Sequence, residues 1–425
     1  MVDIRPFRAI RYTAKAGELE NLITQPYDKI TPQMQREYYA RSPYNYCRVI
    51  LPTEKNRYEA AQQRVRNWLL EGILAKDEAA AVYVYTQAFT VNGETYTRTG
   101  VVAACRLYDF SENTVFPHEV TYNMPKQDRL NMMRAVKKNL EPISFMYSDP
   151  EGKTRRVLSE AASAAPIITV QDSFGVKHTV LQVADMNVVS SLQKIMQDKT
   201  LVITDGHHRY ESALKYRDEM RASTNWTWDS AFNFHMSYLV SCQEPGLVVL
   251  PTHRLLRRVT LTTEHLSRLH MFFNILPLEP SVSAIEAYLA ANRGRNAFAV
   301  YTRGKAYGLT LKSHAQIAPL HASNTSEETR KLDVVILRDV IFNHVLNTGV
   351  LNLDEDILYE RWTKDAVNRV DSGDANVAFL LNPIGPETVW RIAQKHERLP
   401  EKSTDFYPKT ASGLLIMDIS PEEKL

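Results

Sequence analysis

The chain has 425 residues, 44% of them hydrophobic and 24% charged, which is the composition of a globular protein long enough for two or more domains. Its 51 Lys and Arg residues nearly balance 49 Asp and Glu residues, and the formal net charge of +2 gives no electrostatic case for a nucleic-acid partner. No apolar run approaches the roughly 20 residues that span a bilayer, and the N-terminus has no apolar signal core, so we expect a cytoplasmic protein without a membrane span. The cysteines form no C-x-x-C pair, so we expect neither a zinc site nor a disulfide framework.

The N-terminal segment holds two polar clusters. Arg5, Arg8 and Arg11 are closely spaced, and they form either a solvated strand face or part of an anion site. Gln25-Pro26-Tyr27-Asp28 is a loop, because proline disfavours regular structure there, and Asp28 either caps a helix or serves a site. The pattern then predicts a helix over 31–41, a strand over 44–51, a helix over 56–71 and a β-hairpin over 81–107 that turns at Asn92-Gly93.

Residues 116–147 combine a polar loop with a basic helix. His118 and Glu119 lie in the loop, where each is open to metal binding, proton transfer or simple solvation. Lys126 and Arg129 are one turn apart on a helix expected over 126–139, so they either reach one phosphate together or form a solvated basic face. The predicted elements that follow are a strand over 140–147, a helix over 152–165, two strands over 167–183 and a helix over 185–198.

The segment 201–214 carries the strongest functional signal. A β-branched apolar run predicts a buried strand that ends at Asp205, and Gly206 turns the chain into a helix whose first turn holds His207, His208 and Arg209. A helix start attracts anions, arginine offers a two-pronged donor and histidine carries protons near neutral pH. The alternative is an ordinary strand–helix junction capped by Asp205. Because an arginine at a helix start is seldom core, we expect Arg209→Lys to weaken phosphate binding and to leave folding nearly intact.

A second region begins near residue 246. His253 and Arg254 follow a strand over 248–250, at a strand end, where sites are often built. The segment Lys402–Lys409 either folds back on the site through its two lysines or merely docks the terminus. The sequence has no Walker-A lysine loop, no G-x-G-x-x-G turn and no G-x-S-x-G elbow. The further predicted elements are a strand over 235–242, helices over 263–272, 282–292 and 332–346, and strands over 297–302, 306–312 and 375–381.

The Gly206-His207-His208-Arg209 turn resembles known phosphate-binding turns. It is similar to the Gly-Glu-Arg-Arg turn of ParB-type domains, the Gly-Cys-His-Arg turn of sulfiredoxin and the related turn of the ParB-like free serine kinase. Sulfiredoxin's nucleophilic cysteine falls at His207, so thiol chemistry at this turn is excluded. The whole chain resembles a domain-of-unknown-function family, number ten-fifteen, through 5–8, 25–28, 118–119, 126–129, 205–209, 252–254 and 402–409.

The resemblance implies an α+β fold with a ParB/sulfiredoxin-like core and an additional C-terminal α/β region. The expected domains are a nucleotide-binding domain over 1–245 and a C-terminal domain over 246–425. The implied cofactors are Mg²⁺ and a nucleoside triphosphate or diphosphate. The resemblance favours Glu119 as a magnesium ligand or general base, and it favours a site role for Asp28. Together with the residue patterns, the resemblance gives three sets of candidates. The catalytic candidates are Glu119, His207 and His208, and the metal-ligand candidates are Asp28 and Glu119. The phosphate-binding candidates are Asp205, Gly206, Arg209, Lys126, Arg129, His253 and Arg254.

The leading hypothesis is a magnesium-dependent, nucleotide-using phosphotransferase or nucleotide hydrolase that acts on a small molecule. A second hypothesis is a non-catalytic module that senses a nucleotide. A third is a metal-dependent hydrolase that uses His118, His207, His208 and His253, although no two histidines have the i, i+4 spacing of a helical zinc pair. The sequence sets neither the nucleotide nor the oligomeric state.

Overall fold

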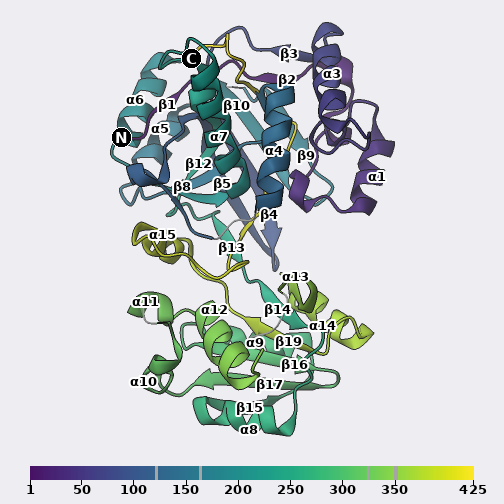
Figure 1. Ribbon diagram of the computed structural model, residues 1–425, viewed down its shortest axis with the longest axis vertical. Helices are drawn as coiled ribbons and strands as arrows, with labels where there is room; N and C mark the ends of the chain where they lie inside the picture. The colour runs from purple at the N-terminus through teal and green to yellow at the C-terminus, as the bar shows by residue number, and fades with distance from the viewer. Residues whose placement is uncertain (120–122, 162–164, 323–324, 349–352) are drawn as a thin grey trace. The chain divides into compact units, whose positions relative to one another are not determined.

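The computed structural model describes residues 1–119, 123–161, 165–322, 325–348 and 353–425, and it is an α+β protein with mixed sheets (Figure 1). The chain forms two compact units. Unit 1 comprises Met1–Pro117, Thr121–Val248 and Pro408–Leu425, and unit 2 comprises His118–Val120 and Val249–Tyr407. The division into a nucleotide-binding domain over 1–245 and a C-terminal α/β domain over 246–425 stays a prediction. Within the described residues, no helix combines the length and the apolar character that a membrane crossing requires.

Unit 1 is built on a nine-stranded mixed sheet. Its hairpin of β4 and β5 turns at Asn92 and Gly93, which both have positive φ, 50° and 83°, as a tight two-residue hairpin turn requires. The predicted hairpin is therefore confirmed. The strand order is β6 (Val115–Pro117), β11 (Leu201–Asp205), β8 (Ile143–Tyr147), β12 (Phe234–Ser241), β5 (Glu94–Arg106), β4 (Val82–Val91), β10 (Lys177–Val183) and β9 (Ile168–Gln171), with β1 (Ile4–Arg5) paired to β5.

Most helices of unit 1 follow the predictions, but the helix expected over 126–139 ends at Val136, and Lys138–Asn139 forms the strand β7. The strand expected over 44–51 is wrong, because the chain forms the helix α2 (Cys47–Ile50) there. The buried Asn45 side chain accepts the N–H of Cys47 at 2.9 Å and starts a helical turn, which overrides the alternating pattern. The other helices are α1 (Pro32–Arg41), α3 (Arg57–Leu70), α4 (Asn123–Val136), α5 (Lys153–Ala161), α6 (Met186–Met196) and α7 (His207–Ser223).

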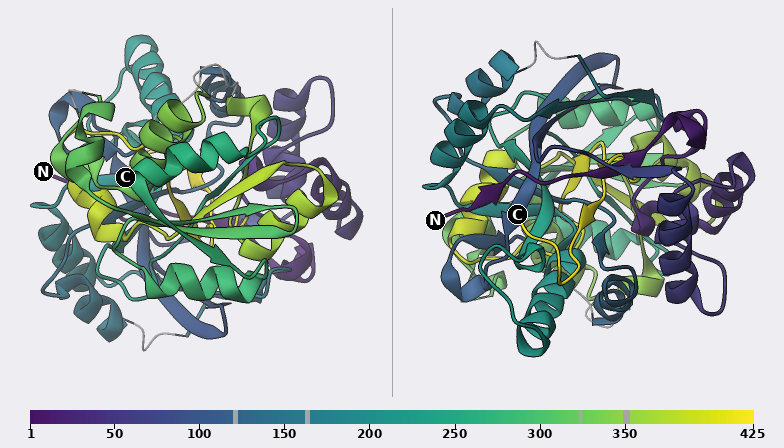
Figure 2. Two further views of the ribbon diagram at one scale, coloured as in Figure 1. Left: turned by 90° about the horizontal axis from the view of Figure 1, so that it is seen from below. Right: turned by 90° about the horizontal axis from the view of Figure 1, so that it is seen from above.

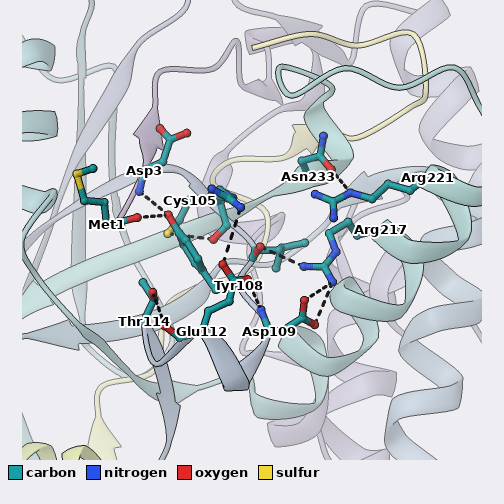
Figure 3. Close-up of polar contacts among 12 residues, drawn as sticks. Met1, Asp3, Cys105, Tyr108, Asp109, Glu112, Thr114, Arg217, Arg221 and Asn233 are labelled. Carbon is teal, nitrogen blue, oxygen red and sulfur yellow. Dashed lines mark hydrogen bonds and ion pairs between the residues drawn. The ribbon is translucent and has the colours of Figure 1, made fainter.

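The helix α7 carries the His-His-Arg turn, and its far half is fixed by polar contacts (Figure 3). Arg217 is buried, and its guanidinium pairs with Asp109 at 3.1 Å and donates to the carbonyl oxygen of Leu107 at 3.1 Å. One turn later, Arg221 donates to the Asn233 side chain at 2.8 Å. Figure 1 shows α4 beside α7, and Lys126 and Glu211 link the two helices.

The end of the chain returns to unit 1. Strand β21 (Met417–Asp418) pairs with β7 (Lys138–Asn139), and Ile416 forms a backbone bridge with Ile10 in β2 (Ile10–Tyr12), which pairs with β3 (Leu74–Lys76). Figure 2 shows this C-terminal segment, in yellow, beside the N-terminal strand, in purple. Ile416 also belongs to the apolar core that contains Val65 and Trp68, so both ends of the chain build one core.

Unit 2 contains a six-stranded antiparallel sheet. Its order is β15 (Phe273–Leu278), β17 (Lys305–Leu311), β16 (Ala297–Thr302), β19 (Val377–Leu381), β14 (His253–Leu256) and β18 (Ile357–Glu360). The helix expected over 332–346 forms as α12 (Asp333–Ile336), which continues as a π-helix over Leu337–Val345. The other α-helices are α8 (Thr263–Phe272), α9 (Val282–Ala291), α10 (His314–Ile317), α11 (Glu327–Arg330), α13 (Leu353–Asp356), α14 (Thr363–Ser372) and α15 (Pro386–Gln394). Strand β13 (Val248–Leu250) pairs with β20 (Asp405–Tyr407) in a separate two-stranded sheet.

Candidate functional site

The turn between β11 and α7 has the strand–turn–helix form that the sequence predicts. The register of β11 against β8 shifts between Ile203 and Asp205, which marks a β-bulge at the end of the strand. Gly206 then adopts φ +89°, a left-handed conformation that favours glycine. A Cβ atom at Gly206 would lie 2.9 Å from Nε of Arg209. The glycine therefore provides both the backbone angle and the room for the arginine side chain.

The guanidinium of Arg209 reaches back over the start of the helix, where it forms hydrogen bonds with other residues of the protein. Its side chain is buried, and it donates hydrogen bonds to the carbonyl oxygen of Pro142 and to the carboxylate of Asp205. The expectation that an arginine at this position lies outside the core is thus wrong. Burying a charged side chain is unfavourable unless hydrogen bonds and an ion pair compensate, and both are present here.

Asp205 lies between two cations. Besides Arg209, its carboxylate pairs with Nζ of Lys409 at 2.9 Å. Burial alone would raise the pKa of Asp205, but the charges of Lys409 and Arg209 outweigh burial and hold that pKa well below its usual range. The carboxylate therefore stays ionised. An ionised carboxylate repels phosphate, so this geometry suits orienting the two cations better than the direct phosphate contact that we expected of Asp205.

The loop around Asp28 reaches the same region of unit 1. The backbone N–H of Tyr27 donates to the buried carboxylate of Glu141 at 3.1 Å, and the Arg129 guanidinium stacks over the Tyr27 ring at 3.9 Å. Burial raises the pKa of Tyr27, while the positive charges of Arg129 and Arg209 act in the opposite direction. Both arginines therefore lie within electrostatic reach of one hydroxyl. Asp28, beside Tyr27, is exposed to solvent.

Three more candidates flank this cluster. His207 and His208 are half-buried in the first turn of α7. Lys126 on α4 pairs through Nζ with Glu211 on α7 at 2.5 Å, and its carbonyl oxygen accepts the Ser212 hydroxyl at 2.8 Å. Lys126 therefore ties α4 to α7 one turn beyond the two histidines.

The remaining candidates belong to unit 2. Glu119 accepts hydrogen bonds from the backbone N–H and the hydroxyl of Thr404, at 3.3 and 3.1 Å. The ring Nε2 of the buried His118 lies 2.8 Å from the same hydroxyl. Arg254 is buried and donates to the carbonyl oxygens of Thr252 and Lys402, at 2.8 and 3.3 Å. These contacts join the loop at 118–119 and strand β14 to the segment around Lys402.

Burial lowers the pKa of both basic residues at the start of β14, His253 and Arg254. Burial lowers the pKa of His253 to about 3, and the neighbouring charge of Arg254 acts in the same direction. Burial also lowers the pKa of Arg254 to about 10. His253 is therefore neutral near pH 7, and Arg254, already bonded to backbone carbonyls, serves as a brace within unit 2. Neither side chain has the free positive charge that the expected phosphate contact requires.

The two candidate metal ligands lie in different units, Asp28 in unit 1 and Glu119 in unit 2, so neither unit alone brings them together. Of the four histidines in the metal-hydrolase hypothesis, His118 and His253 belong to unit 2, and His207 and His208 to unit 1. Among the residues whose positions are described, no three or more His, Cys, Asp or Glu side chains gather as a metal-binding group.

Sequence reasoning missed Glu141 and Lys29, and it left Lys409 open. Glu141 lies between Leu140 and Pro142, just before the apolar strand β8, and a carboxylate at the start of such a strand is the available signal of a buried polar contact. Lys29 directly follows Asp28, and its charge helps to lower the pKa of Asp205. The Lys409 contact joins residues that are far apart in the sequence, and no local pattern indicates it. Arg5, Arg8 and Arg11 instead form ion pairs with Asp3, Glu423 and Asp77, at 3.2, 3.4 and 2.7 Å.

The chain belongs to the family described as "protein of unknown function (DUF1015)", whose model matches residues 4–335, and the expected membership is confirmed. It matches no curated protein sequence. Several solved structures are similar to it at low sequence identity, among them these three. A free serine kinase in complex with AMP is 14% identical, with a TM-score of 0.36, over 74% of this chain and 91% of that chain. A conserved hypothetical protein from Pyrococcus furiosus is 13% identical, with a TM-score of 0.31, over 71% and 93%. SbnI from Staphylococcus aureus, with a C-terminal truncation, is 10% identical, with a TM-score of 0.35, over 75% and 90%.

Proposed function

We propose that unit 1 binds the phosphates of a nucleoside diphosphate or triphosphate at the Gly206 turn, on a ParB/sulfiredoxin-like core. The observation that carries this proposal is the gathering of cationic side chains from four separate segments. Arg209 and Lys409 pair with Asp205, Lys29 acts on the same carboxylate, and Arg129 and Arg209 both act on the Tyr27 hydroxyl. Asp205 and Asp128 offset part of this positive charge, and a polyanionic ligand would offset more of it.

The helix start adds to the attraction. The dipole of the 17-residue helix α7 places partial positive charge at His207 and His208, directly after the left-handed glycine. Lysine binds phosphate as a compact, rotatable charge, which makes Lys409 the best candidate for direct contact. Arg209 is held by Asp205 and Pro142. Its proposed role is therefore to shape the turn and to add positive electrostatic potential at the phosphate site.

We propose further that the protein is a cytoplasmic, magnesium-dependent enzyme that transfers or hydrolyses the terminal phosphate, with a small molecule as acceptor. Mg²⁺ is usually held by one or two carboxylates together with substrate phosphates, and the exposed Asp28 is the carboxylate of unit 1 that suits this role. His207 or His208 would carry the proton, because imidazole titrates near neutral pH. Glu119 stays a candidate general base or metal ligand in unit 2.

Calorimetry with ATP, ADP, CTP and GTP, each with and without Mg²⁺, tests the binding step. We expect at least one nucleotide to bind in a magnesium-dependent way, and Lys409→Gln to weaken binding about tenfold, the scale of one charge-assisted hydrogen bond. Lys424→Gln is the matched control, because Lys424 pairs with Asp229 at the surface of the same unit. No heat from any nucleotide at millimolar concentration contradicts the proposal.

Turnover separates an enzyme from a sensor. Phosphate or a phosphorylated product should accumulate over many cycles in the parent protein, and Asp28→Asn should slow it. Glu119→Gln tests whether Glu119 takes part in the same reaction. If nucleotide binds tightly and no product forms with a panel of small hydroxyl and amine acceptors or with water, the second function, a nucleotide-sensing module, replaces the enzyme. If Glu119→Gln turns over like the parent, Glu119 has no catalytic part.

A further inference from the structure

Two polar residues face each other across the β4–β5 hairpin of unit 1, where apolar side chains would be usual. Gln87 and Arg98 are direct partners in the register of the two strands, and they are 0% and 3% exposed. The Arg98 guanidinium donates to the side-chain oxygen of Gln87, and it lies 5.7 Å from the centre of the Tyr238 ring. Burying an ionised guanidinium is unfavourable unless it makes strong polar contacts. The energetic cost of this buried pair therefore suggests that it has a function beyond packing.

The pair holds a short segment near the end of the chain, residues 408–412, here called the strap. Arg98 donates to the carbonyl oxygen of Pro408, and the Gln87 side-chain amide donates to the carbonyl oxygen of Lys409 at 3.0 Å. Two successive carbonyl groups of the strap are therefore fixed by one buried pair. The backbone at Lys409 cannot shift without breaking these hydrogen bonds.

The strap is also fixed beyond Lys409. The backbone N–H of Ala411 donates to the Tyr85 hydroxyl at 3.3 Å. Ser412 exchanges backbone hydrogen bonds with Thr24, at 3.1 and 2.8 Å, and its hydroxyl donates to Glu141 at 2.7 Å. Glu141 also accepts the N–H of Tyr27. The strap thus connects the β4–β5 hairpin to the loop that carries Asp28.

The fixed backbone determines where the Lys409 side chain can reach. Its Nζ lies 2.9 Å from the Asp205 carboxylate, next to the Gly206 turn, and the side chain is only 10% exposed. A lysine side chain has considerable rotamer freedom, and an anchored backbone reduces the entropy lost when its ammonium group binds. We propose that Gln87 and Arg98 are positioning residues of the nucleotide site, which hold the strap so that the Lys409 ammonium group meets the phosphate. This inference rests on the proposed function.

A double-mutant cycle distinguishes positioning from mere stability. Gln87→Met keeps the volume of the side chain, and it removes both the hydrogen bond to Lys409 and the side-chain acceptor of the Arg98 guanidinium. We expect it to raise the Kd of magnesium ADP about fivefold in the parent and less than about twofold in a Lys409→Met background, because the two residues then act as one unit. Gln193→Met is the matched control, since the Gln193 amide also donates to a backbone carbonyl of unit 1, that of Ile4, and it should leave Kd unchanged. Equal effects of Gln87→Met in both backgrounds overturn the proposal.

Chemical labelling tests the position of Lys409 without any nucleotide. Mass spectrometry after brief treatment with an amine-acylating reagent should find Lys409 labelled slowly in the parent and several-fold faster in Gln87→Met, with Lys424 labelled equally in both. Arg98→Lys, which keeps the charge but changes the geometry, should give the same increase if it folds. Should labelling rise while no nucleotide binds at all, the positioning of Lys409 stands and the proposed function fails. Unchanged labelling of Lys409 in the folded Gln87→Met variant overturns the positioning role.

Discussion

At the scale of single residues, the candidate site is a balance of charges. Asp205 is ionised between Arg209 and Lys409, and Glu141 is buried beneath the Tyr27 loop. Each carboxylate fixes a backbone or cationic group that a ligand could then meet in a set position. Pre-organisation of this kind lowers the entropy that binding would otherwise cost.

Arg209→Gln should destabilise the folded protein by about 3 kcal/mol, because it leaves the half-buried Asp205 with one cation instead of two and removes the hydrogen bond to Pro142. Urea unfolding followed by fluorescence measures the change. Arg134→Gln is the control: Arg134 pairs with Glu219 at the surface, with side chains 41% and 32% exposed, and its loss should cost less than about 1 kcal/mol. Equal midpoints for the two variants would mean that the buried pair contributes no more than a surface pair.

We expect two buried histidines to lower the stability of the protein in mild acid. Burial lowers the pKa values of His235 and His253 to about 3, and the charge of Arg209 adds to the effect at His235. Between pH 6.5 and 3 the unfolded chain therefore binds protons that the folded protein does not, so stability falls as pH decreases through this window. The loss should approach about 1.4 kcal/mol per pH unit for each histidine.

Urea midpoints measured from pH 7.5 to 5 check this dependence, since ordinary carboxylates begin to matter only near pH 4. His235→Gln should flatten the slope if the variant folds, whereas His270→Gln, at an exposed position, should leave it unchanged. A stability that is constant between pH 7 and 5 contradicts the prediction.

At the scale of elements, the Gly206 turn explains why local patterns predicted part of the site correctly. The strand, the glycine and the helix are each encoded within a few neighbouring residues, as is the Asn92-Gly93 hairpin. The strand expected over 44–51 failed because a single side-chain cap from Asn45 outweighs the alternation of apolar residues. The π-helix over Leu337–Val345 was not predictable, because its apolar pattern fits an α-helix equally well.

Gly206→Ala should destabilise the protein more than an ordinary substitution of a left-handed glycine. Alanine at φ +89° costs about 1 kcal/mol, and its Cβ must also displace the Arg209 guanidinium from 2.9 Å. Gly152→Ala is the matched control, because Gly152 has φ +63° and open space around its Cβ position. We expect the loss for Gly206→Ala to be about twice that of the control in urea unfolding, and equal losses would show that Arg209 moves aside freely.

At the scale of the whole molecule, long-range contacts complete unit 1, and sequence spacing could not predict them. Lys409 meets Asp205 and Ile416 meets Ile10 because the chain returns after it has built unit 2. The motifs at 25–28, 129 and 205–209 could be recognised separately, but Lys409 joins them only because the chain returns. Sequence spacing also could not show where Glu119 lies. The family resemblance made Glu119 and Asp28 metal-ligand candidates together, although the two residues belong to different units.

The return of the chain makes a distant residue part of the N-terminal core. Ile416 is 1% exposed within the cluster that holds Ile10, Val65 and Trp68, so Ile416→Ala should destabilise unit 1 by about 2–5 kcal/mol. Hydrogen exchange read by mass spectrometry should show faster exchange in β2 and α3, although these elements lie at the other end of the sequence. Ile285→Ala, in the core of unit 2, is the control and should speed exchange in α9 and β16 instead. If Ile416→Ala changes exchange only in the last residues of the chain, the C-terminal segment is an accessory to unit 1, and the strap cannot hold Lys409 as firmly as its hydrogen bonds imply.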